Sequence, residues 1–312
     1  MSSVPFAFTV DVEGAWLDFP LEQANFDPTP ITAALKLIED EIIRLEKLFS
    51  TKIPVTWFFR CDDSVAHSLG CEEGLLIYLQ DFIKRRKLLG DAFGLHPHFY
   101  KQLDKNSAVW GVETTPEGQR ALILRAAKAW KRFFNEPPKL SRMGEAIMSL
   151  AIAETLDEIG IDLDSTSLSG RERKGDGFFV NWLDAPHKSY KPCKQNYCKE
   201  ATQTISSFQF TEAPFSMLPL HASYDKEPLL RYLNLAYHPE IVKKGLPFLT
   251  NKKSVITILH HHEIDAKREP GPLLTFQIDS VEKNIRNIIS ELGEIRFCTL
   301  LDNFFSKVVH NV

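Results

Sequence analysis

Segments with the pattern of buried strands alternate with segments of helical periodicity along most of this chain. The strand-like segments are short and rich in β-branched and aromatic residues, whereas the helical segments repeat apolar residues every three or four positions. This alternation is typical of a parallel sheet covered by helices, because parallel strands need long crossover connections. The expected strands cover residues 4–12, 53–59, 92–99, a short run that ends at 142, 161–165, 255–259 and 295–300.

The helical segments carry start and stop signals. Thr29-Pro30 and Thr115-Pro116 each combine an N-cap residue with a first-turn proline, and Gly160 is placed to end a helix. In the first helix an apolar stripe runs as far as Leu48. The expected helices cover residues 29–48, 72–88, 115–134, 145–159 and 280–292.

At 312 residues the chain is long enough for one large, barrel-like α/β domain. Between residues 167 and 253 the regular alternation fades, and glycine, proline, serine and aromatic residues become frequent. Short strand patterns remain there, at residues 178–182, 208–212 and 216–220. We interpret this stretch as an elaboration over the barrel mouth, so that residues 1–312 are expected to form a single domain.

The charge pattern argues against nucleic acid as a partner. The net charge is -4, and no stripe of lysine and arginine is interleaved with aromatic residues. A neutral or weakly charged substrate fits this balance better than a polyanion.

Three observations favour a cytoplasmic protein without a membrane span. The first residues lack the positive segment of a signal peptide, and no apolar run is long enough to cross a bilayer. The cysteines are odd in number and scattered, which indicates reduced thiols rather than a disulfide framework. The spacing of Cys193 and Cys198 matches no zinc motif, so we expect a surface loop there.

Two acidic residues, Asp11 and Glu13, stand at the end of the first expected strand. Separated by one residue, they share a face of that strand. Like charges so close are unfavourable unless a cation or an arginine compensates them. The pair therefore predicts a metal site.

His96 and His98 flank Pro97 at the end of the third expected strand, and their spacing places both imidazoles on one face. With a carboxylate from another strand, they form a set of two histidines and one carboxylate. Such a set leaves coordination positions open for water and substrate, as a catalytic metal requires. Two histidines in a polar loop would give the same local pattern, and the acidic pair in the first strand favours the metal site.

Other polar residues also stand where expected strands end, which is where parallel α/β folds form their sites. A run of three histidines follows the strand at 255–259, and within an extended segment His260 and His262 share a face while His261 does not. The residues at strand ends are Asp11, Glu13, Arg60, His96, His98, Arg142 and Asp164.

Five short segments, taken in chain order, resemble the motifs of the metal-dependent polysaccharide deacetylase family. They are Thr9-Val10-Asp11-Val12-Glu13-Gly14, Gly94-Leu95-His96-Pro97-His98, Ser141-Arg142-Met143-Gly144, Asp164-Ser165-Thr166 and Leu259-His260. The resemblance implies a distorted (β/α) barrel of about seven parallel strands that removes N-acetyl or O-acetyl groups from sugars. Within the family, the chain looks most like the subgroup that acts in surface-polysaccharide or lipopolysaccharide biosynthesis.

Two spacings differ from the usual family motifs. The common first motif has two neighbouring aspartates, whereas here Val12 separates Asp11 from Glu13. The usual second motif spaces its histidines four apart, whereas His96 and His98 are two apart. Both variants keep the paired side chains on one face.

The resemblance also implies roles for individual residues. A divalent metal, zinc by preference, is expected on Glu13, His96 and His98. Asp11 is expected to be the general base, Arg142 to pair with Asp11 and keep it ionised, and His260 to protonate the leaving group. A surface arginine and a solvated histidine cluster are the alternative interpretations of Arg142 and His260.

Several further residues each have a functional and a structural interpretation. Asp164 either braces the site or caps a loop, and Arg60 and Asp62 either contact substrate or form a surface ion pair. Four aromatic residues could stack on a sugar, although aromatic residues in such numbers are more often core. The bracing or substrate-contacting set is Asp164, Arg60, Asp62, His262 and Tyr100, and the aromatic set is Trp57, Tyr100, Trp110 and Trp182.

The sequence leaves three functional hypotheses. The first is a cytoplasmic hydrolase that removes an acetyl group from a nucleotide-linked or lipid-linked sugar precursor. The second is an amidohydrolase of the same fold that acts on a cyclic or formyl amide, and the third is an inactive carbohydrate-binding descendant. An iron oxygenase would suit the ligand set, but its usual double-stranded β-helix does not suit the alternation of strands and helices.

Overall fold

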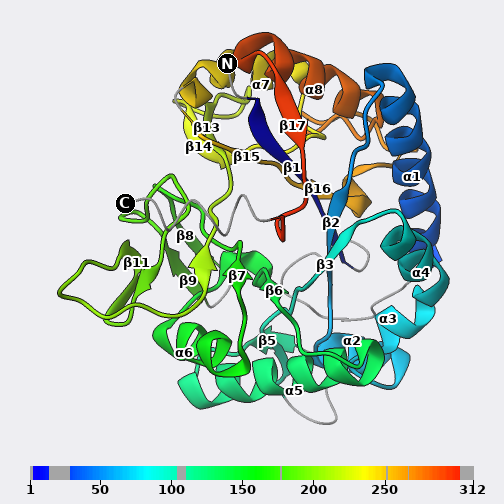
Figure 1. Ribbon diagram of the computed structural model, residues 1–312. Helices are drawn as coiled ribbons and strands as arrows, with labels where there is room; N and C mark the ends of the chain where they lie inside the picture. The colour runs from blue at the N-terminus through cyan, green and yellow to red at the C-terminus, as the bar shows by residue number, and fades with distance from the viewer. Residues whose placement is uncertain are drawn as a thin grey trace.

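The computed structural model describes residues 3–13, 29–103, 110–175, 178–250, 252–265 and 267–302. A parallel sheet lies at its centre, and helices surround it (Figure 1). The strands follow the order β12-β7-β6-β3-β2-β1-β15, and β16 and β17 also pair with β1. They span Val4–Val12 (β1), Val55–Phe59 (β2), Ala92–Leu95 (β3), Leu140–Ser141 (β6), Leu163–Asp164 (β7), Thr211–Glu212 (β12), Val255–Ile256 (β15), Leu259–His260 (β16) and Ile295–Phe297 (β17).

Every pairing in this sheet is parallel, which confirms the predicted fold class, a distorted (β/α) barrel of about seven parallel strands. The two ends of the strand path approach each other at Ser216. Its backbone N–H donates to the carbonyl of Ile256 at 3.1 Å, and its hydroxyl accepts from the Ile256 N–H at 2.9 Å. The segment after β12 is thereby tied to β15.

The register of β1 determines what surrounds its carboxyl end. Residues 8–12 pair with β2, whereas Asp11 lies directly opposite His260 of β16. The two residues that the sequence assigned as base and acid are therefore adjacent in the sheet.

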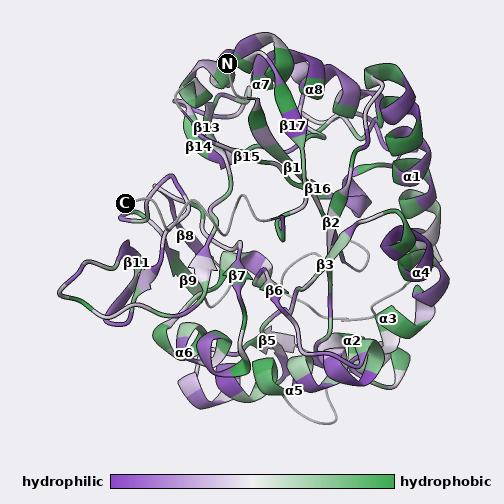
Figure 2. Ribbon diagram, viewed as in Figure 1, coloured by the Kyte–Doolittle hydropathy of each residue, from purple (hydrophilic) through white to green (hydrophobic). Residues whose placement is uncertain are grey.

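The helices outside the sheet mix hydrophilic and hydrophobic residues (Figure 2), and their apolar residues form buried faces. In α1, Ile31 and Leu45 are fully buried, but Leu48 is 42% exposed. The predicted apolar stripe therefore ends one turn early. These outer helices are α1 (Thr29–Phe49), α5 (Pro116–Phe134), α6 (Leu150–Ile159) and α8 (Asp279–Leu292).

Two predicted helices differ from the observed ones. The helix predicted at 72–88 forms as α3 (Gly74–Tyr78) and α4 (Gln80–Leu88), which are separated at Leu79 (φ -99°, ψ 15°). A helix that was not predicted, α2 (Asp63–Leu69), precedes them and ends at Gly70 with a left-handed φ of 85°. The helix predicted at 145–159 begins only at Leu150, with Ser149 as its N-cap. Before it, Glu145 and Ala146 adopt left-handed backbone angles (φ 55° and 56°) within a short 3-10 turn, η1 (Gly144–Ala146).

The third strand is shorter than predicted, because β3 stops at Leu95 and His96 to Phe99 are irregular. Pro97 has no N–H to offer a strand ladder. The carbonyl of Pro97 instead accepts from the N–H of Gly144 at 3.0 Å. The two histidines consequently lie on an irregular segment beyond the strand end.

The stretch at 167–253 contributes to the central sheet, because β12 lies within it and pairs with β7. The stretch interpreted as an elaboration therefore includes one strand of the central sheet. The rest forms small antiparallel pairs and a helix, and one further pair precedes α5. The pairs are β8 (Glu172–Gly175) with β9 (Phe178–Asn181), β10 (Pro192–Cys193) with β11 (Asn196–Glu200), β13 (Met217–Leu220) with β14 (Leu229–Tyr232) and β4 (Tyr100–Gln102) with β5 (Trp110–Val112). The helix is α7 (Pro239–Gly245), and the 3-10 turn η2 (Leu246–Leu249) follows it. Another 3-10 turn, η3 (His261–Glu263), lies beyond the stretch and follows β16.

Cys193 and Cys198 lie on β10 and β11, and both are buried rather than exposed in a surface loop. The thiol of Cys198 donates to the carbonyl of Asn181 at 3.0 Å. Of the helices that the structure describes, none combines the length and the apolar character that crossing a membrane requires.

Candidate active site

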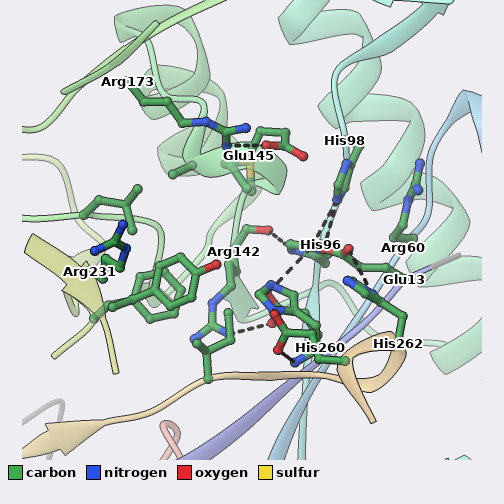
Figure 3. A pocket seen from close by; sticks show the side chains of 18 of the residues that line it. Glu13, Arg60, His96, His98, Arg142, Glu145, Arg173, Arg231, His260 and His262 are labelled. Atoms are coloured by element: carbon green, nitrogen blue, oxygen red, sulfur yellow. Dashed lines mark hydrogen bonds and ion pairs between the residues drawn. The ribbon is translucent and has the colours of Figure 1, made fainter. Parts of the chain in front are cut away.

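A pocket of about 480 Å³ opens at the carboxyl ends of the central strands (Figure 3). It gathers side chains that are far apart in the sequence. The predicted site residues that line it are Asp11, Glu13, Arg60, His96, His98, Tyr100, Arg142, His260 and His262.

Glu13, His96 and His98 converge on one point of this pocket. The Nε2 atom of His96 lies 3.0 Å from Oε1 of Glu13 and 3.2 Å from Nε2 of His98, and His98 Nε2 lies 3.4 Å from the same carboxylate oxygen. One atom of each residue falls within 4.8 Å of the others, a spacing that a metal ion can bridge.

Hydrogen bonding fixes which nitrogen of His96 faces this point. Its Nδ1 lies 2.8 Å from the carbonyl oxygen of Arg142. A carbonyl only accepts, so Nδ1 carries the proton and, in a neutral ring, Nε2 presents a lone pair. That lone pair faces a carboxylate oxygen of Glu13. Two acceptors at this distance repel unless a cation, or a second proton on His96, lies between them.

His98 is held as a neutral ring. Burial lowers its pKa, and the nearby Arg60 guanidinium lowers it further. Its Nδ1 atom is buried and has no hydrogen-bond partner among the described residues. A neutral imidazole is the form that binds metals.

Glu13 remains ionised in this setting. Burial alone would raise its pKa, but the neighbouring imidazoles of His96 and His98 bring the pKa well below the ordinary value. The set thus offers one anionic oxygen and two imidazole nitrogens, a combination that suits a divalent ion such as zinc.

Gly144, in the segment after β6, leaves room for the His98 ring. A Cβ atom built on Gly144 would lie 2.2 Å from Cδ2 of His98, well inside van der Waals contact. The glycine of the Ser141-Arg142-Met143-Gly144 segment is therefore required by the position of that imidazole.

Asp11 is paired with Arg142 and is almost fully buried. Arg142 donates from Nη1 to Oδ1 of Asp11 at 2.6 Å and to the hydroxyl of Thr9 at 2.9 Å. The other carboxylate oxygen, Oδ2, lies 3.7 Å from Nε2 of His260 and 3.9 Å from Nε2 of His96. Arg142 therefore holds one oxygen of Asp11 and leaves the second directed at the pocket.

Arg142 is a buried residue, not a surface one. Its guanidinium lies between two aromatic rings, 4.0 Å from the centroid of Phe58 and 4.4 Å from that of Phe215. It also donates from Nε to the carbonyl of Ser165 at 3.0 Å. These contacts fix the guanidinium beneath the carboxylate of Asp11.

His260 lies between two acids. Its Nδ1 is 3.2 Å from Oε1 of Glu263, opposite the nitrogen that faces Asp11. Burial would lower its pKa, but Glu263 raises that pKa to about 10. Both ring nitrogens are therefore protonated at neutral pH, and the ring is positively charged. Glu263 is itself held by Asn234, which donates to Oε2 at 2.6 Å.

The three successive histidines have different surroundings. Only His260 ends a strand, and His261 begins the 3-10 turn η3. His261 faces away from the pocket: its Nδ1 accepts from the backbone N–H of Glu13 at 3.3 Å, and burial lowers its pKa to about 3. His262 lines the pocket, with Nδ1 3.8 Å from Oε2 of Glu13.

Arg60 and Asp62 form an ion pair, but a buried one. Arg60 donates from Nε and Nη2 to the two carboxylate oxygens at 2.7 and 2.9 Å. Arg60 lines the pocket, whereas Asp62 caps α2 and accepts from the backbone N–H of His98 at 3.2 Å. Asp62 therefore fixes the backbone of a candidate metal ligand instead of contacting the cavity.

Asp164 lies behind the pocket wall. It is fully buried, accepts from the hydroxyl of Ser141 at 2.5 Å and shares a hydrogen bond with Glu212 of the neighbouring strand β12. Burial raises the pKa of both acids, and Asp164 raises that of Glu212 further, so the pair shares a proton. Glu212 also accepts from the backbone N–H groups of Thr166 and Ser167 at 3.1 and 2.9 Å.

Of the four aromatic candidates for sugar stacking, Tyr100 alone lines the pocket. Its hydroxyl donates to Glu145 at 3.3 Å. Trp57, Trp110 and Trp182 are buried elsewhere in the fold, so the stacking interpretation is wrong for them.

The sequence interpretation missed several residues of the pocket. Glu263 directly follows the three histidines, and its acidic character three residues after His260 was an available signal. Glu145 directly follows the Ser141-Arg142-Met143-Gly144 segment. Other missed residues belong to the irregular stretch and carry no local signal, among them Arg171, Arg173, Phe215, Arg231, Tyr232 and Tyr237.

Comparison with known proteins gives similarity at the level of the fold. No family model matches the sequence, and no curated protein matches it. A solved protein from Mycobacterium smegmatis, described as a candidate polysaccharide deacetylase, has a TM-score of 0.51 at 12% identity, over 99% of this chain and 89% of that one. A family 4 acetyl xylan esterase from Clostridium thermocellum, in complex with a cobalt ion, has a TM-score of 0.40 at 13% identity, over 98% and 92%. The likeness to the mycobacterial protein is a likeness of fold, and it agrees with the distorted barrel seen here.

Proposed function

We propose that this chain is a divalent-metal-dependent hydrolase that removes an acetyl group from a sugar, and a member of the polysaccharide deacetylase family. One observation carries the proposal: Glu13, His96 and His98 meet at one point of a pocket that Asp11 and His260 also line. The order of the five sequence motifs and the similarity of fold to the mycobacterial protein support the family assignment.

The metal would be held by Glu13, His96 and His98, with zinc as the expected ion. A divalent cation there would supply Lewis acidity, which polarises the acetyl carbonyl and acidifies a water molecule. Asp11 would accept a proton from that water molecule while the water oxygen bonds to the carbonyl carbon. His260 would deliver a proton to the leaving amine nitrogen or sugar oxygen as the bond to the acetyl carbon breaks, giving acetate and a free amine or hydroxyl.

The pairing of Asp11 with Arg142 supports the assignment of Asp11 as the general base and of Glu13 as the metal ligand. One oxygen of Asp11 is occupied by Arg142 at 2.6 Å, whereas Glu13 is engaged only by imidazoles in the contacts above. Glu263 supports the role of His260, because it keeps the ring protonated and therefore able to act as an acid.

The substrate we propose is a small molecule or an oligosaccharide that carries an acetyl group. A cytoplasmic location would make a nucleotide-linked or lipid-linked precursor of a surface polysaccharide or lipopolysaccharide the natural substrate. The motif resemblance supports that subgroup.

The test is acetate release from a panel of acetylated sugars by protein loaded with zinc. Acetate release by the wild-type protein that is lost in Glu13→Ala, together with the bound metal, is the expected result. Hydrolysis of formyl or cyclic amides without acetate release would assign the related amidohydrolase activity instead. Sugar binding without any turnover in the presence of metal would identify a carbohydrate-binding protein and contradict the proposal.

A further inference from the structure

Three arginines from the irregular stretch line the pocket, and they differ in how their charges are compensated. Arg173 is paired with Glu145, and Arg231 is paired with both oxygens of Asp225 at 2.8 Å. Arg171 has no carboxylate within 4.0 Å among the residues that the structure describes. Figure 3 shows Arg173 and Arg231 across the pocket from Glu13 and His98.

The surroundings of Arg171 make an uncompensated charge unfavourable. Burial lowers its pKa, and the neighbouring guanidinium groups of Arg231 and Arg173 lower the pKa further, while Tyr232 and Tyr237 act in the opposite direction. A half-buried cation beside two like charges is stabilised when an anion binds to it. The guanidinium fork matches the oxygens of a phosphoryl group or a carboxylate.

Arg171, Arg173 and Arg231 form a cationic wall of the pocket, and side chains beside this wall contact the candidate catalytic groups. The rings of Tyr232 and Tyr237 are stacked with centroids 6.1 Å apart, and the ring of Tyr232 lies 6.0 Å from that of His260. On the other side, Glu145 joins Arg173 to Tyr100, whose ring lies 5.3 Å from that of His98. One ligand in a cavity of about 480 Å³ can therefore contact both walls.

We propose that Arg171 binds an anionic group of the substrate, so that this protein acts on an acetylated sugar that also carries a phosphoryl group or a carboxylate. This inference rests on the proposed deacetylase function for the identity of the reacting bond. The net charge of -4 led us to expect a neutral or weakly charged substrate. The charge of the pocket wall, and not that of the whole chain, determines which ligand is selected there.

Binding can be measured apart from turnover with sugars that carry no acetyl group. Calorimetric titration of the zinc-loaded protein with glucose 1-phosphate, galacturonate and glucose compares a phosphoryl group, a carboxylate and a neutral sugar. We expect one of the two anionic sugars to bind about 10- to 100-fold more tightly than glucose, in keeping with hydrogen bonds to a charged group. In Arg171→Ala this preference should disappear, and in Arg171→Lys it should be partly restored.

The control is Arg120→Ala, which removes an exposed arginine of α5 that is paired with Glu158. It should keep the wild-type preference. Equal affinity for all three sugars in the wild-type protein would overturn the proposal, and so would an unchanged preference in an Arg171→Ala variant that melts at the wild-type temperature. A preference for an anionic sugar, without acetate release from any acetylated sugar, would support the anion site at Arg171 and contradict the deacetylase function.

The same variants separate specificity from catalysis where turnover is observed. For N-acetylglucosamine 1-phosphate, Arg171→Ala should lower kcat/KM by about 10- to 100-fold, mainly through KM. For neutral N-acetylglucosamine the loss should be smaller, because that sugar has no anionic group for Arg171 to bind. An equal loss for both substrates would assign Arg171 a structural role and contradict the inference.

Discussion

Asp11 and His260 are direct partners across the parallel pair of β1 and β16, with Oδ2 of Asp11 3.7 Å from Nε2 of His260. Each is held from its far side, Asp11 by Arg142 and His260 by Glu263. The register of one strand pair thus places a buried carboxylate and a protonated imidazole next to each other. Both groups line the same pocket, so one can accept and the other donate a proton at a single bond there.

Replacing Asp11 by asparagine should slow turnover while leaving the metal bound. A general base typically contributes about 100- to 10,000-fold to the rate, and kcat of Asp11→Asn should fall by that factor. Glu13→Gln is the matched variant, and it should lose the metal. Metal content and kcat measured on both proteins decide the assignment. Loss of metal in Asp11→Asn, with retention in Glu13→Gln, would show that the two acids have the opposite roles.

Removing Arg142 should destabilise the protein strongly, because the carboxylate of Asp11 is then left buried without its partner. We expect Arg142→Met to reduce the free energy of unfolding by about 3–5 kcal/mol, as for other broken buried pairs. Arg120→Met breaks the exposed pair with Glu158 and should cost less than about 1 kcal/mol. Urea denaturation of the two variants makes the comparison. Similar losses in both would contradict the importance assigned to the buried pair.

Adding a methyl group at Gly144 should disturb the candidate metal centre without unfolding the protein. The new Cβ would lie 2.2 Å from the ring of His98, so the imidazole must move. We expect Gly144→Ala to bind zinc about 10- to 100-fold more weakly, the range seen when the support of a metal ligand is lost. Gly271→Ala is the control, since the nearest atom to its Cβ would be 3.8 Å away. Unchanged zinc affinity in Gly144→Ala would show that His98 is not a ligand.

The buried acids Asp164 and Glu212 should make stability depend on pH. Burial raises the pKa of Glu212 well above the ordinary value of 4.5, so the folded protein holds a proton that the unfolded chain releases. The stabilisation is complete below about pH 4.5 and is lost as the pH rises through the folded-state value. In Glu212→Gln the neutral amide replaces the protonated acid, so the wild-type protein should lose stability relative to this variant as the pH rises. Urea denaturation between pH 4 and pH 9 measures this difference, and a difference that does not change with pH would contradict the shared proton.

The sequence was sufficient for those parts of the site that local geometry determines. The period of a strand placed Asp11 and Glu13 on one face, and the ends of the parallel strands placed His96 and Arg142 in the same region. The fold class followed from the alternation of helices and strands, because parallel pairing requires it.

The parts that the sequence could not predict depend on contacts between distant segments or on unusual backbone angles. Glu145 faces the pocket because a left-handed turn replaces the first turn of the predicted helix. Glu212 reaches Asp164 only because β12 joins the central sheet from within an irregular stretch. Arg171 enters the pocket from that same stretch, where no periodicity indicates which side chains face inward.

The most direct test of the account is a calorimetric titration of zinc into metal-free protein. We predict about one zinc ion per wild-type chain and no measurable binding in Glu13→Ala or His96→Ala. His187→Ala, which removes an exposed histidine outside the main pocket, should bind as the wild type does. Wild-type affinity in both Glu13→Ala and His96→Ala would contradict the claim that these residues hold a metal ion together.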